Sequence, residues 1–203
     1  MKTKKVLIVD IESTCWLKDR DKKIDETPPN EKSEIIEIGA TLLRTGPLED
    51  ITRFPLFEDY GTIYVKPEHS TISEFCSNLN GVTQDILDKY GVNFMEACKL
   101  LQNRFNSKQL VWASYGDYDK RIFEQQCKER GIEYPFGPRH INIKVVLATL
   151  LGLKKEVGMD QALQIMGLKL EGRHHSAMDD SMNTAKIYQK ISDSCKLYQE
   201  HRF

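Results

Sequence analysis

The order of its apolar segments predicts that this chain folds as an α/β domain with a mixed sheet. Residues 4–11 indicate a buried strand, because Val6–Val9 form a continuous and mostly β-branched apolar run that ends at Asp10. Residues 34–43 and 62–65 indicate two further strands, and no helical pattern separates the three. Helical patterns then alternate with a short strand at residues 110–114. Strands that come first and later alternate with helices favour a mixed sheet flanked by helices.

Local signals along the chain define the individual elements. The first three strands should form a meander, because only a loop and a turn join them. Residues 17–33 are polar and contain two adjacent prolines, so they predict a mobile surface loop. Gly131 is the expected end of one helix. The helical patterns cover residues 83–90, 93–106, 117–130, 143–151, 159–166 and 177–197.

Length and composition place the chain among globular proteins. It has 203 residues, of which 40% are hydrophobic and 29% charged, and this suits a single domain over residues 1–203 with a sizeable core. No apolar run approaches the roughly 20 residues that cross a bilayer, so no membrane partner is expected. The apolar run after the basic start is too short for a signal peptide.

Charge and cysteine usage exclude further classes of protein. Lys and Arg total 29 against 30 Asp and Glu, a net charge of −1, whereas proteins that coat long duplex DNA carry a large basic surplus. Any contact with nucleic acid should therefore be local. The five cysteines are widely spaced without a C-x-x-C pair. This spacing is typical of reduced thiols in a cytoplasmic protein and argues against a structural zinc site.

Two carboxylates follow the first apolar run. Asp10 and Glu12 are two residues apart on the predicted strand, so both side chains point to one face with Cα atoms roughly 6.5–7 Å apart. Carboxylates this close repel unless a positive group lies between them, and a hard divalent cation with oxygen ligands is the obvious candidate. A solvated strand end is the alternative explanation for the same pattern.

A second acidic cluster marks the start of the last predicted helix. Ser176 and Asp179 have the spacing of a capping box, which gives Asp179 a structural role. Asp180 instead lies on the stripe that should face the sheet, together with Thr184, Ile187 and Ile191. A buried carboxylate costs several kcal/mol unless it is paired or binds a metal, so Asp180 is the functional candidate. His175 precedes the helix and can reach the same site, or it is a surface histidine.

The same argument separates two aspartates in the middle of the chain. Asp117 is a natural N-cap on the solvent side of its helix, whereas Asp119 shares its face with the apolar Ile122 and Phe123. Asp119 is therefore the functional candidate. The neighbouring Tyr118 could stack on a base or pack against the protein.

Three motifs occur in order along the chain. They are V-D-I-E-S-T at residues 9–14, Y-D-x-x-x-F at 118–123 and H-x-x-x-x-D at 175–180. Together they resemble the motifs of the DEDDh 3′–5′ exonucleases of the ribonuclease H-like superfamily, over residues 4–193. The segments E-I-I-E at 34–37, F-C-x-x-L-x-G-V-T at 75–83 and D-D-S-x-N at 179–183 are most similar to the branch of enhancer-of-RNAi, histone-mRNA 3′-exonuclease and KapD-like proteins.

The resemblance implies a fold, an activity and a set of site residues. The fold would be a ribonuclease H-like mixed five-stranded sheet flanked by helices. The activity would be metal-dependent 3′–5′ hydrolysis of single-stranded nucleic acid, RNA more than DNA, to nucleoside 5′-monophosphates, with no obligate protein partner. Two Mg²⁺ or Mn²⁺ ions would be held by the family's acidic residues, which fall here on Asp10, Glu12, Asp119 and Asp180.

The resemblance also assigns the general base and a nucleotide pocket. The base falls on His175, because its five-residue spacing to Asp180 matches the motif; His174 falls outside that spacing. The pocket for the 3′-terminal nucleotide would be lined by Ile11, Ser13, Thr14, Leu79, Asn80 and Tyr118.

Three other interpretations compete with the exonuclease. An RNA-binding domain of the same fold with weak catalysis is disfavoured because every acidic position is filled. An endonuclease of the ribonuclease H type is disfavoured by His175 and by the L-x-G-V-T segment. An α/β domain with unrelated carboxylates would need several core-facing acids by accident.

Overall fold

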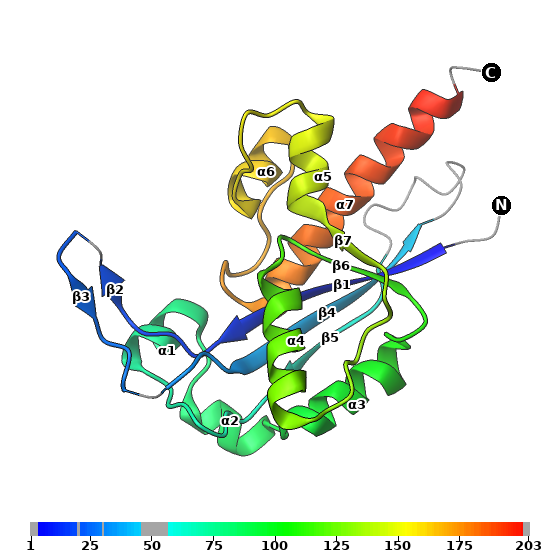
Figure 1. Ribbon diagram of the computed structural model, residues 1–203. Helices are drawn as coiled ribbons and strands as arrows, with labels where there is room; N and C mark the ends of the chain where they lie inside the picture. The colour runs from blue at the N-terminus through cyan, green and yellow to red at the C-terminus, as the bar shows by residue number, and fades with distance from the viewer. Residues whose placement is uncertain (1–3, 20, 30, 46–56, 201–203) are drawn as a thin grey trace.

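A mixed sheet forms the centre of the computed structural model, which describes residues 4–19, 21–29, 31–45 and 57–200 (Figure 1). Within this part of the chain the five-stranded sheet has the order β5-β4-β1-β6-β7. Antiparallel pairing joins β1, β4 and β5, and parallel pairing joins β1, β6 and β7. The strands are β1 (Lys4–Ser13), β4 (Ile35–Thr45), β5 (Phe57–Tyr64), β6 (Val111–Ser114) and β7 (His140–Asn142). The predicted meander and the mixed five-stranded sheet are confirmed.

Helices cover both faces of this sheet (Figure 1). They are α1 (Glu74–Asn80), α2 (Gln84–Tyr90), α3 (Phe94–Phe105), α4 (Tyr118–Arg130), α5 (Ile143–Leu150), α6 (Met159–Ile165) and α7 (Ala177–Glu200). None of the helices within the described ranges is both long and apolar enough to pass through a membrane.

The alternation of side chains along β1 decides which face each of its residues serves. Leu7, Val9 and Ile11 are buried in the core shared with α3 and α4. Val6 and Ile8 are buried in the opposite core, which is shared with α5, α6 and α7. Because side chains two apart lie on one face, Asp10 and Glu12 continue the Val6 and Ile8 row. They therefore face α7.

Several elements differ from the sequence-based expectation. The segment 17–33, expected to be a mobile surface loop, contains a small hairpin of β2 (Lys18–Asp19) and β3 (Ile24–Asp25). This hairpin projects from the sheet (Figure 1). Strands of two residues carry no detectable hydrophobic alternation, so the pattern could not show them. The edge strand β7 is missed because it spans three residues.

Helix α1 was also missed, although its ends carry clear signals. The Ser73 side chain accepts from the Cys76 N–H at the N-cap, and Gly81 ends the helix at a φ of 80°. This serine and this glycine are typical capping residues. A seven-residue helix is too short to show an amphipathic period, so the caps were the usable signal.

The first turn of α7 packs directly on β4. Gly39 lies opposite Asp10 in the antiparallel ladder, and a Cβ at Gly39 would be 1.9 Å from the Ala177 carbonyl oxygen. Two residues earlier on the same strand face, Glu37 accepts the Ala177 N–H at 3.1 Å. This close approach brings the start of α7 down to the strand that carries Asp10 and Glu12.

Gly39→Ala tests this packing. The added methyl group meets helix backbone rather than a movable side chain, so we expect a loss of about 1–3 kcal/mol or more of unfolding free energy. Gly158→Ala is the control, because Gly158 has a φ of −65° and none of the described residues lies within 4 Å of its added Cβ. Its cost should stay below about 1 kcal/mol. Denaturant unfolding measures both, and equal losses would contradict the packing argument.

Candidate active site

Three carboxylates from two elements converge between β1 and α7. Asp10 and Glu12 come from one face of β1, and Asp180 comes from the first turn of α7. Carboxylate oxygens of the three lie within 4.8 Å of one another. Asp180 is 4% exposed, so its predicted core-facing orientation is confirmed. Neighbouring strand and helix thus build one cluster of oxygen donors.

Backbone N–H groups hold the Asp180 side chain in place. Its carboxylate accepts the His175 N–H at 3.0 Å, and the Asp180 N–H donates to the Ser176 carbonyl at 2.8 Å. His175 has a φ of 65°, in the left-handed region that non-glycine residues rarely adopt. The left-handed residue turns its backbone N–H toward the start of the helix. The loop that carries His174 and His175, called the histidine loop below, is therefore held to Asp180 by this hydrogen bond.

Asp119 approaches the cluster from α4. It is 5% exposed, as its predicted core-facing position requires, and it accepts the Ile11 N–H at 3.0 Å. This N–H is available because β6 pairs with β1 only as far as Ile8. The charge of Asp119 acts on Asp10, although Asp119 does not belong to the group of carboxylates within 4.8 Å of one another.

Ionising all the carboxylates of this cluster is electrostatically unfavourable, because they are buried close to one another. Burial, and then the charges of Asp119 and Asp180, raise the pKa of Asp10 well above its ordinary value. Burial, and then Asp180, raises the pKa of Glu12 to about 8. Burial raises the pKa of Asp119 to about 7. A divalent cation would offset this repulsion, and a donor set of carboxylate oxygens suits a hard ion. The residues present therefore fit a metal of the Mg²⁺ or Mn²⁺ type.

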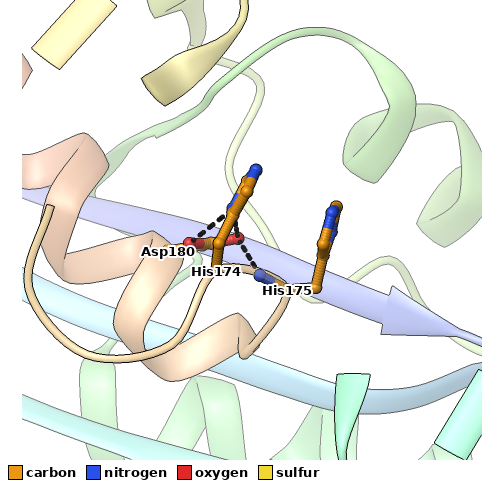
Figure 2. A group of neighbouring side chains, drawn as sticks. All are labelled: His174, His175 and Asp180. Atoms are coloured by element: carbon orange, nitrogen blue, oxygen red, sulfur yellow. Dashed lines mark hydrogen bonds and ion pairs between the residues drawn. The ribbon is translucent and has the colours of Figure 1, made fainter. Parts of the chain in front are cut away.

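Two histidine side chains lie close to the carboxylate cluster of Asp10, Glu12 and Asp180. Their rings are stacked with centroids 4.1 Å apart. Figure 2 shows them on the loop that leads into α7. His175 Nδ1 is 3.9 Å from Glu12 Oε1, and His174 Nδ1 is 3.0 Å from Asp180 Oδ2. The expectation that spacing keeps His174 away from the site is wrong. The left-handed backbone at His175 places both rings on one side of the loop, which a count of residues cannot reveal.

The predicted capping roles of Asp179 and Asp117 also need correction. The Asp179 carboxylate accepts the Arg173 N–H at 2.8 Å, while the Ser176 N–H donates to the Arg173 carbonyl, so the reciprocal bond of a capping box is not formed. Asp117 occupies the N-cap position of α4, but within the described chain its side chain accepts no capping hydrogen bond. Both side chains are nevertheless outside the carboxylate cluster, as expected.

The residues expected to line a nucleotide pocket differ in accessibility. Tyr118 is 42% exposed, and its hydroxyl lies 2.8 Å from Ser13 Oγ. Leu79 is half-buried. Thr14 and Asn80 are buried and bonded internally, Thr14 to Ser70 and Glu34 and Asn80 to Cys76 and Val82. Ile11 and Ser13 are also buried. Tyr118 and Leu79 therefore offer the most accessible side-chain surface.

Glu37 is a buried carboxylate that the site predicted from the sequence does not include. This side chain is 3% exposed, lies opposite Glu12 in the ladder and accepts the N-terminal N–H of α7. Burial raises its pKa to about 7. The available signal was an acidic residue within an apolar strand, the same signal that selected Asp180.

Comparison with known proteins identifies relatives across almost the whole chain. The model of the exonuclease family RNase_T matches residues 7–188. The chain is 31% identical to 3′-5′ exoribonuclease 1 of Rattus norvegicus over 95% of its length, and 28% identical to ERI1 exoribonuclease 2 of Homo sapiens over 94%. It covers 54% and 29% of these two relatives, so it corresponds to a part of each.

Solved structures agree with this assignment. The nuclease domain of 3′hExo, described as a DEDDh family member bound to rAMP, superimposes with a TM-score of 0.75 at 28% identity. The match covers 95% of this chain and 94% of that domain. A structure of 3′-end specific recognition of a histone mRNA stem-loop by 3′-exonuclease gives a TM-score of 0.77 at 28% identity, over 95% and 65% of the two chains. The chain therefore belongs to the RNase_T exonuclease family, as a DEDDh member of the branch that contains 3′-5′ exoribonuclease 1 and ERI1 exoribonuclease 2.

Proposed function

We propose that this chain is a 3′–5′ exonuclease that hydrolyses single-stranded nucleic acid, RNA in preference to DNA, to nucleoside 5′-monophosphates. The convergence of Asp10, Glu12 and Asp180 beside His175 carries this proposal. Membership of a divalent-metal-dependent exonuclease family supports it. The similar proteins are exoribonucleases, and two of the similar solved structures concern rAMP and a histone mRNA stem-loop. Both observations favour RNA.

Two Mg²⁺ or Mn²⁺ ions are the proposed cofactors. Asp10, Glu12 and Asp180 would hold one ion, and Asp119 would contribute with Asp10 to the other. Bound ions of this kind polarise the scissile phosphate, lower the pKa of the attacking water and offset the charge that develops in the transition state. The buried carboxylates fit this role because their mutual repulsion makes the site attractive to cations.

His175 is the proposed general base, which takes a proton from the attacking water. Burial, and then the neighbouring His174, lowers the pKa of His175, and this keeps the imidazole in the neutral form that a base requires. The water oxygen forms the new bond to phosphorus as the bond to the 3′ oxygen breaks, and the 3′ oxygen leaves with that electron pair and takes a proton from solvent. The ring is 3.9 Å from Glu12, on the accessible side of the cluster.

Substrate binding is proposed to be local to the 3′ end. The net charge of −1 means that the chain lacks the large basic surplus typical of proteins that bind long duplexes. Tyr118 is exposed beside Ser13 and Asp119, where its ring can stack on an unpaired terminal base. The grip would then extend over a few unpaired nucleotides.

The first experiment follows 5′-labelled RNA and DNA oligomers in Mg²⁺, Mn²⁺ or EDTA. We expect a ladder that shortens from the 3′ end with either ion, none in EDTA, and faster loss of single-stranded RNA than of paired ends. A 3′-phosphate should block the reaction, because the site has to accept the terminal nucleotide. Cleavage of a circular single strand at a comparable rate would instead show an endonuclease, and undiminished hydrolysis in EDTA would exclude the metal mechanism.

A second prediction separates the neighbouring aspartates of α7. Asp180→Asn removes a buried carboxylate from the cluster, so turnover should fall by at least about 100-fold. Asp179→Asn keeps an oxygen that can accept the Arg173 N–H, so it should cost no more than about 1 kcal/mol of stability. Initial rates of hydrolysis, measured at equal concentrations of folded Asp180→Asn and Asp179→Asn protein, test this difference. If Asp179→Asn were inactive and Asp180→Asn active, the assignment of these two aspartates to faces of the helix would be wrong.

A third prediction concerns the stability of the metal-free protein. Burial raises the pKa of Glu12 to about 8 and that of Glu37 to about 7, from ordinary values of 4.5. The folded protein therefore retains protons that the unfolded chain has released, and stability should fall as pH rises from about 5 to 8. Glu37→Gln keeps the acceptor for Ala177 and should flatten this slope. Thermal midpoints in EDTA across this range provide the test, and an unchanged slope would count against the raised pKa.

A further inference from the structure

Two sets of donors share Asp180, and they differ in chemistry. Asp10, Glu12 and Asp180 offer only oxygen. His174, His175 and Asp180 offer two imidazole nitrogens and one carboxylate, again within 4.8 Å of one another. Figure 2 shows this second set, with the His174 ring next to the Asp180 carboxylate and the His175 ring to one side of it. The metal chemistry proposed for the nuclease does not use His174.

One pair in the second set already has the spacing of two ligands of a transition-metal ion. Ligands of a tetrahedral Zn²⁺ at about 2.0–2.2 Å lie roughly 3.3 Å from one another, and His174 Nδ1 is already 3.0 Å from Asp180 Oδ2. The His175 ring stacks on His174 and has to rotate to join them. The two histidine side chains are 42% and 44% exposed, so this rotation meets little packing.

The Asp180 side chain is held for such a role. Its carboxylate oxygen accepts the His175 backbone N–H at 3.0 Å, which orients the ligand as a neighbouring hydrogen bond commonly does at metal sites. The donor types then select the ion, because imidazole favours zinc and later transition metals over Mg²⁺. An oxygen-only set and a nitrogen-rich set thus compete for one aspartate.

We propose that His174, His175 and Asp180 form an inhibitory site for a transition-metal ion of the Zn²⁺ type. An ion bound there withdraws Asp180 from the oxygen cluster and occupies the imidazole of His175, so that it can no longer accept a proton. His174 supplies the ligand that distinguishes this site from the catalytic one. The inhibition rests on the nuclease activity proposed above, whereas the binding site does not.

The binding experiment uses Zn²⁺ alone with the metal-free protein. Calorimetric titration should show a site that His174→Ala weakens by at least about tenfold, and Co²⁺ should give the absorption bands of a nitrogen-ligated ion that this variant loses. His69→Ala is the matched control, because the His69 side chain is 76% exposed and lies outside the cluster. His174→Gln, checked for fold by thermal unfolding, guards against a variant that fails to fold. Equal Zn²⁺ affinity in wild type and both His174 variants would overturn the proposal.

The inhibition experiment measures Mn²⁺-supported hydrolysis at increasing Zn²⁺, with each variant normalised to its own zinc-free rate. The wild type and His69→Ala should lose activity at a Zn²⁺ concentration at least about tenfold lower than His174→Ala. Identical inhibition curves would overturn the inhibitory role. Zn²⁺ binding that depends on His174 in a protein without nuclease activity would support the site and refute the proposed function, so the two failures are distinguishable.

Discussion

The arrangement of the site depends on the close approach of α7 to β4 at Gly39. Asp10 and Glu12 are fixed to a strand face, and Asp180 can reach them only if the first turn of the helix lies against the sheet. The absent side chain at Gly39 permits that approach, and Glu37 anchors it by accepting the first N–H of the helix. Ser181, one residue after Asp180, adds a hydrogen bond of 2.8 Å to Thr41 on the same strand face.

This packing forces acidic groups together, and backbone donors offset part of the cost. The Ile11 N–H donates to Asp119, the His175 N–H to Asp180 and the Ala177 N–H to Glu37. Each bond favours an ionised carboxylate, whereas burial and neighbouring charges oppose it. Burial and repulsion outweigh these hydrogen bonds, so the pKa values of Asp119, Asp180 and Glu37 are raised. A bound cation would relieve this repulsion, whereas the stability of the fold does not require it. Raised pKa values of this kind are typical of functional sites, where burial and like charges are brought together.

Much of the fold and the location of the carboxylates follow from local periodicity. Alternation along β1 places Asp10 and Glu12 on one face, and helical phase separates Asp180 from Asp179 and Asp119 from Asp117. The bond from Ala177 to Glu37 joins residues 140 positions apart, so no local pattern could indicate it. The place of His174 depends on a single positive φ at His175, and residue spacing carries no information about that angle.

The histidine loop is also coupled to the segment expected to bind the nucleotide. The Arg173 guanidinium donates to the carbonyls of Asn78 and Leu79 at the end of α1, where the helix dipole favours a positive charge. Gly81 makes room for it, because a Cβ there would be 2.0 Å from an Arg173 nitrogen. Since Asp179 holds the Arg173 backbone and Asp180 holds that of His175, the loop is tied to both α1 and α7. Arg173 therefore connects the end of α1, which belongs to the segment expected to bind the nucleotide, to the loop that carries the proposed base.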